Sequence, residues 1–336
     1  MILLSESPAI SVIIPMFNSE KYIRQCLVSV LSQKLQDFEA IVIDDCSTDQ
    51  SVAEVEKLMP MFDGRLQLIR RESNAGGAAV PRNQAIKAAR GKYLVFLDSD
   101  DMLLPDAFTM LFNESEQAGA DVLHLEKFFL FNDDGTGRFN AKEMKLASNE
   151  PRKFMVNEPV VVTDDLVERI KLHCKKRFYW SPCTKTFRRD LIVDNGIEFT
   201  DIPYYEDLIF SFKCLCLSKK YVRVPYVANI IRVRQDSMSK SRGNDVLDRW
   251  LKVFVDGSNA MDKFMRGLDF FKQNPRLRHK EIGFFVERCF ETISSLFRDH
   301  DEHEIYSAIC QRLADDPRGA AVPLAYFISI QKKSLR

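Results

Sequence analysis

The stretch Tyr93-Leu94-Val95-Phe96-Leu97-Asp98-Ser99-Asp100-Asp101 decides the fold, because five apolar or aromatic residues run directly into three carboxylates. The apolar part has the length of a strand buried on both faces, as in a parallel sheet. Carboxylates just past such a strand lie at the carboxyl edge of the sheet, where open α/β folds bind ligands. Three neighbouring acids repel one another, and a hard divalent cation with oxygen ligands would hold them best. The alternative is a surface turn with a helix cap, since Asp also begins turns and helices.

Working outward, the residues before this stretch alternate between apolar runs and amphipathic segments. Strands are expected at 10–15, 38–43, 66–69 and 93–97, and helices at about 20–33, 50–59 and 79–89. This alternation implies a mostly parallel sheet with right-handed crossovers. The second strand also ends in acids, which places Asp44 and Asp45 along the same edge of the sheet as the acids at 98–101.

The rest of the chain continues this pattern and then changes character. We expect a helix from just after Pro105 to about residue 117, a strand at 121–125, an apolar helix at 208–217 and a strand at 221–231. Residues 131–160 are polar and rich in Gly, Asp and Asn, which is typical of a hairpin or a mobile loop. From about residue 245, apolar stripes at helical spacing predict helices packed on one another or on the sheet domain.

The composition excludes several classes of protein. The 336 residues carry 48 basic and 48 acidic side chains, and this zero net charge argues against a general nucleic-acid binder. The eight cysteines form no CxxC pair and indicate reduced thiols of a cytoplasmic protein. The five histidines are scattered and form no zinc constellation. We expect neither a signal peptide nor a membrane-spanning helix.

Six short stretches follow one another in a characteristic order. They are Ser11–Asn18, Leu31–Gln33, Phe38–Asp49, Asn74–Gly77, Pro81–Asn83 and Phe96–Asp101. Together they resemble family 2 inverting glycosyltransferases of the GT-A fold, and the Glu206-Asp207 pair with the loop at 232–241 extends the resemblance to about residue 240. Phe17 stands where the family usually has Tyr, and Pro81 where Ala is common. The family's Trp-Asn-Lys run is altered in Trp180–Lys185, which leaves the acceptor side less defined than the donor side.

The resemblance implies an α/β GT-A domain over residues 1–240, with a donor half at about 1–120 and an acceptor half at about 121–240. Residues 241–336 form a helical C-terminal extension that carries no motif of the family. The implied function is metal-dependent inverting transfer of a sugar from a nucleotide-sugar, a UDP-sugar above all, to a glycan or lipid-linked acceptor in cell-surface polysaccharide synthesis. Basic residues near the end of the chain (Lys332, Lys333 and Arg336) permit peripheral contact with the inner face of the membrane.

The donor side of the site is carried over residue by residue. Asp45 matches the carboxylate that accepts from a uracil-type ring N–H, although a helix cap is its alternative role. Pro15 and Phe17 would supply backbone contacts and an aromatic wall. The resemblance also assigns the donor site Asn74, Gly76 and Gly77, Arg82, and Arg234 with Ser237 on a loop that closes over the diphosphate. The two glycines would let the backbone approach the nucleotide. Arg82 would pair with phosphate or with the acids, and its alternative is an exposed helix charge.

Asp98 and Asp100 form the family's Asp-x-Asp motif, with Asp101 adjacent. The resemblance implies that one acid contacts the ribose and another ligates Mg²⁺ or Mn²⁺ at the diphosphate. We favour Asp100 as the ligand, with Asp101 beside it, and Asp98 on the donor.

An inverting transfer needs a general base, and Asp207 matches the family's base position with Glu206 beside it. The alternative is that both acids only complement a helix dipole.

Other classes of protein share parts of this pattern. A haloacid-dehalogenase-like phosphatase also has Asp-x-Asp after a strand, but it needs Thr or Val where this chain has Met102, and it needs the motif on the first strand. An inactive sugar-nucleotide binding module is a further alternative, but we would expect such a module to have lost the acids.

Overall fold

The computed structural model describes residues 7–132, 136–139, 156–233 and 244–296, together with Ser307 and Gln311. The chain folds as two units. Unit 1 comprises residues 1–165, 179–199 and 210–235, and unit 2 comprises residues 166–178, 200–209 and 236–336. Glu206 and Asp207 thus belong to the same unit as the C-terminal helices. The domain boundary expected near residue 240 stays a prediction.

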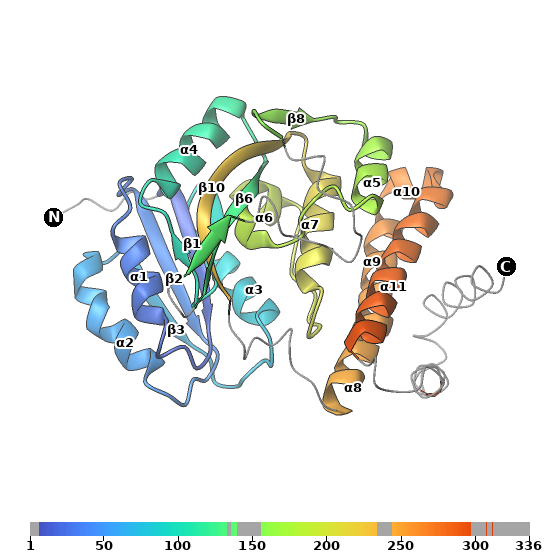
Figure 1. The fold of residues 1–336 in the computed structure, drawn as a ribbon. Helices are drawn as coiled ribbons and strands as arrows, with labels where there is room; N and C mark the ends of the chain where they lie inside the picture. Colours follow the sequence, from blue (N-terminus) through green and yellow to red (C-terminus); the bar gives the residue numbers. More distant parts are fainter. Residues whose placement is uncertain are drawn as a thin grey trace. The chain divides into compact units, whose positions relative to one another are not determined.

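The apolar runs of the first hundred residues form one half of a ten-stranded sheet in unit 1 (Figure 1). Its strands are β1 (Ile10–Met16), β2 (Phe38–Asp44), β3 (Leu66–Arg70) and β4 (Tyr93–Phe96). They are parallel and lie in the order β3-β2-β1-β4. All residues of β2 and β4 are buried, as continuous apolar runs predict for strands covered on both faces.

The other half of the sheet is mixed. β9 (Lys185–Arg188) lies between β4 and β6 (Val122–Asn132) and is antiparallel to both. β9 was not predicted from the sequence, because four residues are too few to reveal a strand by alternation. β6 pairs in parallel with β10 (Tyr221–Val233), and both strands extend beyond their predicted ends. The short strands β5 (Met102–Leu103), β7 (Gly137–Phe139) and β8 (Val160–Val162) complete the sheet.

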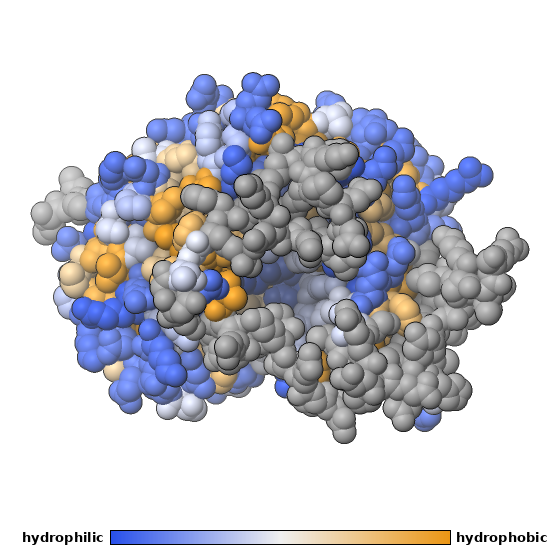
Figure 2. Space-filling model, viewed as in Figure 1, coloured by the Kyte–Doolittle hydropathy of each residue, from blue (hydrophilic) through white to orange (hydrophobic). Residues whose placement is uncertain are grey.

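Helices cover both faces of this sheet. On one face, alternate residues of β1 pack with the buried side of α1 (Ile23–Leu31). On the other face, the ring of Phe96 contacts the rings of Phe187, Phe199 and Phe210. The surface over α2 (Ser51–Leu58) is mostly hydrophilic (Figure 2), because the buried apolar residues of that helix, Val55 and Leu58, point inward. The helical segments that lie wholly in unit 1 are α1 (Ile23–Leu31), α2 (Ser51–Leu58), η1 (Met59–Phe62), α3 (Ala79–Ala88), α4 (Ala107–Ala118), η3 (Pro182–Thr184) and α6 (Arg189–Asp194).

Unit 2 is built from helices. α9 (Ser258–Gly267) and α11 (Pro275–Leu296) lie side by side (Figure 1). Their apolar stripes, which include Met261, Met265 and Phe285, are fully buried. The helices predicted after residue 245 are therefore present in the described part of the chain. Its elements are α5 (Leu166–Cys174), α8 (Asn244–Lys252), the π-helical η5 (Val253–Gly257), α9 (Ser258–Gly267), α10 (Asp269–Gln273) and α11 (Pro275–Leu296), and α7 (Glu206–Leu217) begins in this unit. Across the described residues, no helix combines the length and apolar character needed to span a membrane.

Candidate active site

The carboxyl ends of β1, β2 and β4 lie along one edge of the sheet in unit 1. β1 is in parallel register with both neighbours. The segments that follow these three strands carry Phe17, Asp45 and Asp98. The structure therefore places both groups of acids on the edge where the sequence analysis expected them. Phe17 is 50% exposed there, so its ring is accessible to a ligand.

Short polar side chains connect the loops that follow these strands. The Oδ1 atom of Asn18 accepts a hydrogen bond from the backbone N–H of Thr48 at 2.8 Å, and the Asn18 N–H donates to the Ser47 hydroxyl at 3.0 Å. The hydroxyls of Ser19 and Ser99 lie 2.7 Å apart, which ties the first loop to the turn that carries the acids. These bonds fix the three loops relative to one another.

Asp45 is buried at the end of β2 and is held by two donors. Its Oδ1 atom lies 2.8 Å from the Nε of Arg71, and its Oδ2 atom accepts from the backbone N–H of Ala75 at 3.0 Å. Asp45 does not cap α2, whose first residue, Ser51, donates its N–H to the Asp49 side chain instead. Arg71 was not singled out from the sequence, because an Arg just after a strand has no distinguishing pattern.

The loop from Asn74 to Gly77 closes this corner of the site. The Asn74 amide donates to the carbonyl of Asp45 at 2.7 Å, and the N–H of Gly76 donates back to the Asn74 side chain at 2.7 Å. Gly76 has a φ of 74°, a backbone conformation that residues other than glycine rarely adopt. No atom lies within 4 Å of a Cβ built at Gly76 or Gly77, so the space beside this backbone is open.

Arg82 reaches from α3 to the acids. It is only 3% exposed, and its Nη2 atom donates to Oδ1 of Asp98 at 2.8 Å. Its guanidinium also lies over the ring of Phe199, 5.2 Å from the centroid. The alternative of a solvent-exposed helix charge is therefore wrong.

The three carboxylates interact with one another. Burial raises the pKa of Asp101 well above its ordinary value, and the charges of Asp98 and Asp100 raise it further. Burial, and then the charges of Asp101, Asp100 and Asp98, likewise raise the pKa of the Cys26 thiol. The Asp101 Oδ1 atom accepts from the backbone N–H of Arg232 at 2.8 Å, which partly offsets this repulsion.

Arg232 is a site residue that the sequence analysis did not single out. Its Nε donates to the carbonyl of Asp100 at 3.1 Å, and its Nη2 donates to Gln25 at 2.6 Å. The guanidinium lies 5.0 Å from the ring centroid of Tyr22 and 5.2 Å from that of Phe131. The sequence placed residue 232 in a surface loop, whereas in the structure it still belongs to β10. Arg234, Ser237 and the basic residues near the C-terminus lie outside the described residues.

The donor set suits a hard divalent cation, because it consists of carboxylate oxygens whose mutual repulsion raises the pKa of Asp101. Among the described residues, however, no three His, Cys, Asp or Glu side chains form a ready-made metal group. A cation here would therefore be held as Mg²⁺ often is, by one or two carboxylates together with phosphate oxygens of a substrate.

In unit 2, Glu206 and Asp207 form the first turn of α7. The carbonyl of Tyr205 accepts the first hydrogen bond of this helix, from the N–H of Ile209 at 3.1 Å. Both acids are half-buried at the positive end of the helix dipole. This placement suits a base and a dipole partner alike, so both interpretations stay open.

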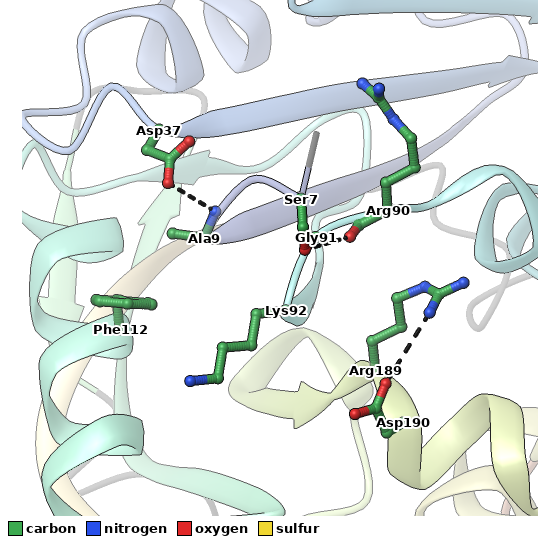
Figure 3. Close-up of a pocket in the computed structure, with 9 residues that line it drawn as sticks. All are labelled: Ser7, Ala9, Asp37, Arg90, Gly91, Lys92, Phe112, Arg189 and Asp190. Carbon is green, nitrogen blue, oxygen red and sulfur yellow. Dashed lines mark hydrogen bonds and ion pairs between the residues drawn. The ribbon is translucent and has the colours of Figure 1, made fainter. Parts of the chain in front are cut away.

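A separate cavity of about 250 Å³ lies at the amino ends of β1, β2 and β4. Arg90, Lys92 and Arg189 line it, but their cationic ends point in different directions (Figure 3). Arg90 pairs with Glu39 at 2.8 Å and Lys92 with Glu116 at 2.7 Å. Because these cations do not converge, the cavity lacks the features of an anion site.

Part of this chain is similar in sequence to known glycosyltransferases. Residues 11–165 match the model of the family described as glycosyl transferase family 2. The poly(ribitol-phosphate) beta-glucosyltransferase of Bacillus spizizenii is 32% identical over 214 residues, which cover 63% of this chain and 30% of that protein. TarS of Staphylococcus aureus, a poly(ribitol-phosphate) beta-N-acetylglucosaminyltransferase, is 34% identical over 210 residues, covering 60% of this chain and 32% of that protein. This chain thus spans less than a third of the length of these two relatives.

Solved structures share the fold. The crystal structure of S. aureus TarS 1-349 in complex with UDP-GlcNAc matches 95% of this chain and 92% of that chain, with a TM-score of 0.58 and 23% identity. The mannosyltransferase PcManGT from Pyrobaculum calidifontis, in complex with GDP-Man and Mn²⁺, matches 98% of this chain and 87% of that chain, with a TM-score of 0.51 and 15% identity. The predicted GT-A fold is confirmed.

Proposed function

We propose that this chain, which belongs to glycosyltransferase family 2, transfers a sugar from a UDP-sugar to a hydroxyl group of a cell-surface polymer or its lipid-linked precursor, with inversion at the anomeric carbon and with a divalent cation. The observation that carries the proposal is the common edge of unit 1, where Asp45 follows β2 and the acids at 98–101 follow β4. A site for a nucleoside diphosphate needs one group that binds the base and another that neutralises the phosphate charge. This edge of the sheet has candidate residues for both groups.

The base-binding end is Asp45 with Phe17. Arg71 and Ala75 hold the Asp45 carboxylate in place, and a carboxylate oxygen has two lone pairs, so it can also accept from the ring N–H of uracil. The exposed ring of Phe17 offers a surface for the base, with Pro15 beside it on the backbone. The open space beside Gly76 and Gly77 leaves room for the nucleotide.

The diphosphate end is the acid cluster with its two arginines. Asp100, with Asp101 beside it, would hold Mg²⁺ or Mn²⁺, and the bound ion would stabilise the charge on the departing UDP. Arg82 keeps Asp98 in place for the ribose, and Arg232 fixes the backbone of Asp100 and the carboxylate of Asp101. Both arginines lie beside the acids, so these side chains would order the carboxylates around the donor.

For the acceptor, we assign Asp207 as the general base that takes the proton of the attacking hydroxyl, with Glu206 beside it. The named activities of the relatives suggest a poly(ribitol phosphate) type of polymer, rich in hydroxyl groups, as the first acceptor to test. Among the described residues, no disulfide joins the seven cysteines, and we propose that the protein works in the cytoplasm.

The test is calorimetric titration of UDP into the full chain with and without Mn²⁺. We expect Mn²⁺ to strengthen UDP binding to the wild type and to have no effect on Asp100→Ala. Asp106→Ala is the matched control, because Asp106 is an exposed acid of the same segment that pairs with Lys34. No binding of UDP by the wild type would refute the donor assignment. Equal affinity with and without Mn²⁺ would refute the metal assignment.

A further inference from the structure

Tyr205, the residue before the two acids of α7, has an unusual backbone conformation. Its φ is 63°, in the left-handed region that non-glycine residues seldom occupy. Its carbonyl accepts from the N–H of Ile209, so this strained residue is the one from which the helix begins. Such a conformation persists only where the surroundings hold it in place.

Contacts with the helices of unit 2 keep Tyr205 in this conformation. The Tyr205 hydroxyl lies 2.7 Å from Oγ1 of Thr292 on α11. The same hydroxyl donates to the carbonyl of Arg288 at 3.3 Å, so Tyr205 is bound to two groups of α11. The Tyr205 ring also makes edge contacts with Trp250 of α8 and Phe285 of α11, whose ring centroids lie 5.0 and 6.0 Å away. Burial raises the pKa of Tyr205 to about 12, so the hydroxyl keeps its hydrogen at neutral pH.

We infer that Tyr205 is a positioning residue, which fixes the turn bearing Glu206 and Asp207 by anchoring it through its hydroxyl to α11. The C-terminal helices thereby gain a role in the proposed transfer, although they carry no acid of the site. This inference rests on the proposed function, because it takes Asp207 as the general base.

The neighbouring tyrosine provides a matched control. Tyr204 also contacts Trp250, stacked face to face at 4.8 Å and 16°. Its hydroxyl is buried and has no hydrogen-bond partner in the described part of the chain. Tyr204→Phe and Tyr205→Phe therefore each remove one hydroxyl from adjacent rings, and only the second removes an anchor.

The first measurement is amide hydrogen exchange in the full-length chain, followed at the N–H of Ile209. This measurement needs no substrate. Tyr205→Phe should speed exchange at Ile209 several-fold, since it removes both hydroxyl contacts with α11. Thr292→Val should speed exchange less, since it removes only one of the two contacts. The double variant should exchange no faster than Tyr205→Phe. Tyr204→Phe should exchange like the wild type.

The second measurement is release of UDP from UDP-GlcNAc in the presence of Mn²⁺ and poly(ribitol phosphate). A group displaced by about 1 Å loses up to about a hundredfold in rate, so Tyr205→Phe should lower kcat about tenfold or more. The KM for UDP-GlcNAc should stay within about twofold, because the donor residues belong to unit 1. A purely structural role would instead lower the amount of folded protein without this separation of kcat from KM.

The outcomes separate the two hypotheses. Unchanged exchange at Ile209 in Tyr205→Phe overturns the anchor, whereas faster exchange with an unchanged kcat overturns the positioning role. Asp207→Asn, measured alongside, tests the proposed base independently. If Asp207→Asn turns over UDP-GlcNAc like the wild type, the base assignment fails, whereas a loss of turnover in Asp207→Asn with a normal Tyr205→Phe rejects only the positioning role.

Discussion

Arg82 and Asp98 form an ion pair of 2.8 Å in which the cation is almost completely buried and the carboxylate is not. The Arg82 side chain is 4% exposed and the Asp98 side chain is 43% exposed. The pair joins the helix α3 to the turn after β4, and it leaves one side of the carboxylate facing the edge where the donor is proposed to bind.

Replacing Arg82 tests whether this pair orders the acid cluster. Arg82→Gln removes the charge and leaves Asp98 without its partner, so we expect a loss of about 1–3 kcal/mol in the free energy of unfolding. The affinity for UDP in the presence of Mn²⁺ should fall about tenfold. Lys87→Gln is the control, because Lys87 lies on the same helix, is 72% exposed and pairs with Glu198. Exposed pairs contribute about 0–1 kcal/mol, so this variant should behave like the wild type. Equal effects of the two substitutions would show that burial of the pair is irrelevant.

The raised pKa of Asp101 predicts a dependence of stability on pH in metal-free protein. The unfolded carboxyl titrates near pH 4, whereas the folded one keeps its proton to higher pH. The folded state therefore binds more protons above about pH 4, and its stability falls as the pH rises, by at most about 1.4 kcal/mol per pH unit, until the folded group has also ionised.

Asp101→Asn removes this term while retaining an oxygen that can accept from the Arg232 N–H. Urea unfolding in the presence of a chelator should show the variant gaining stability relative to the wild type as the pH rises from about 4. Parallel curves for the two proteins would contradict the raised pKa.

A substitution of Gly91 tests how closely the chain packs against β1 and does not involve the candidate active site. A Cβ at this position would lie 2.5 Å from the backbone nitrogen of Ser11 and 2.7 Å from the carbonyl carbon of Ile10. Because backbone atoms cannot move aside cheaply, Gly91→Ala should lower the free energy of unfolding by about 1–3 kcal/mol. Gly77→Ala, where nothing lies within 4 Å, should change it by less than about 1 kcal/mol. Thermal unfolding of both variants checks this, and an unaffected Gly91→Ala would contradict the close approach.

Asp207→Asn keeps the shape of the side chain but cannot accept a proton. If Asp207 is the general base, sugar transfer should fall by about 10²–10⁴, while UDP affinity stays within a few-fold. Near-normal transfer would move the role to Glu206. If Glu206→Gln also transferred normally, the two acids would serve only the helix dipole, and the base would lie elsewhere.

The parts of the site that could be predicted from sequence are those with local signals. Apolar runs such as 93–97 end in acids, and parallel strands bring their carboxyl ends to one edge, so the placement of Asp45 and Asp98 followed from pattern alone. The partners of these acids did not follow. Arg71 and Arg232 carry no local pattern that separates them from other surface arginines, and Arg232 meets Asp101 only because β10 crosses back to the turn after β4.

The sequence by itself determined the periodicity of the elements, the parallel first half of the sheet and the edge at which the acids gather, because burial and the pleat of a strand act on neighbouring residues. Only the tertiary structure decided the antiparallel insertion of β9, the burial of Arg82 and the anchor of Tyr205 on Thr292. Each of these features depends on residues far apart in the chain. A tyrosine in the left-handed backbone conformation is stable only where distant helices keep it there, and no local sequence pattern encodes such contacts.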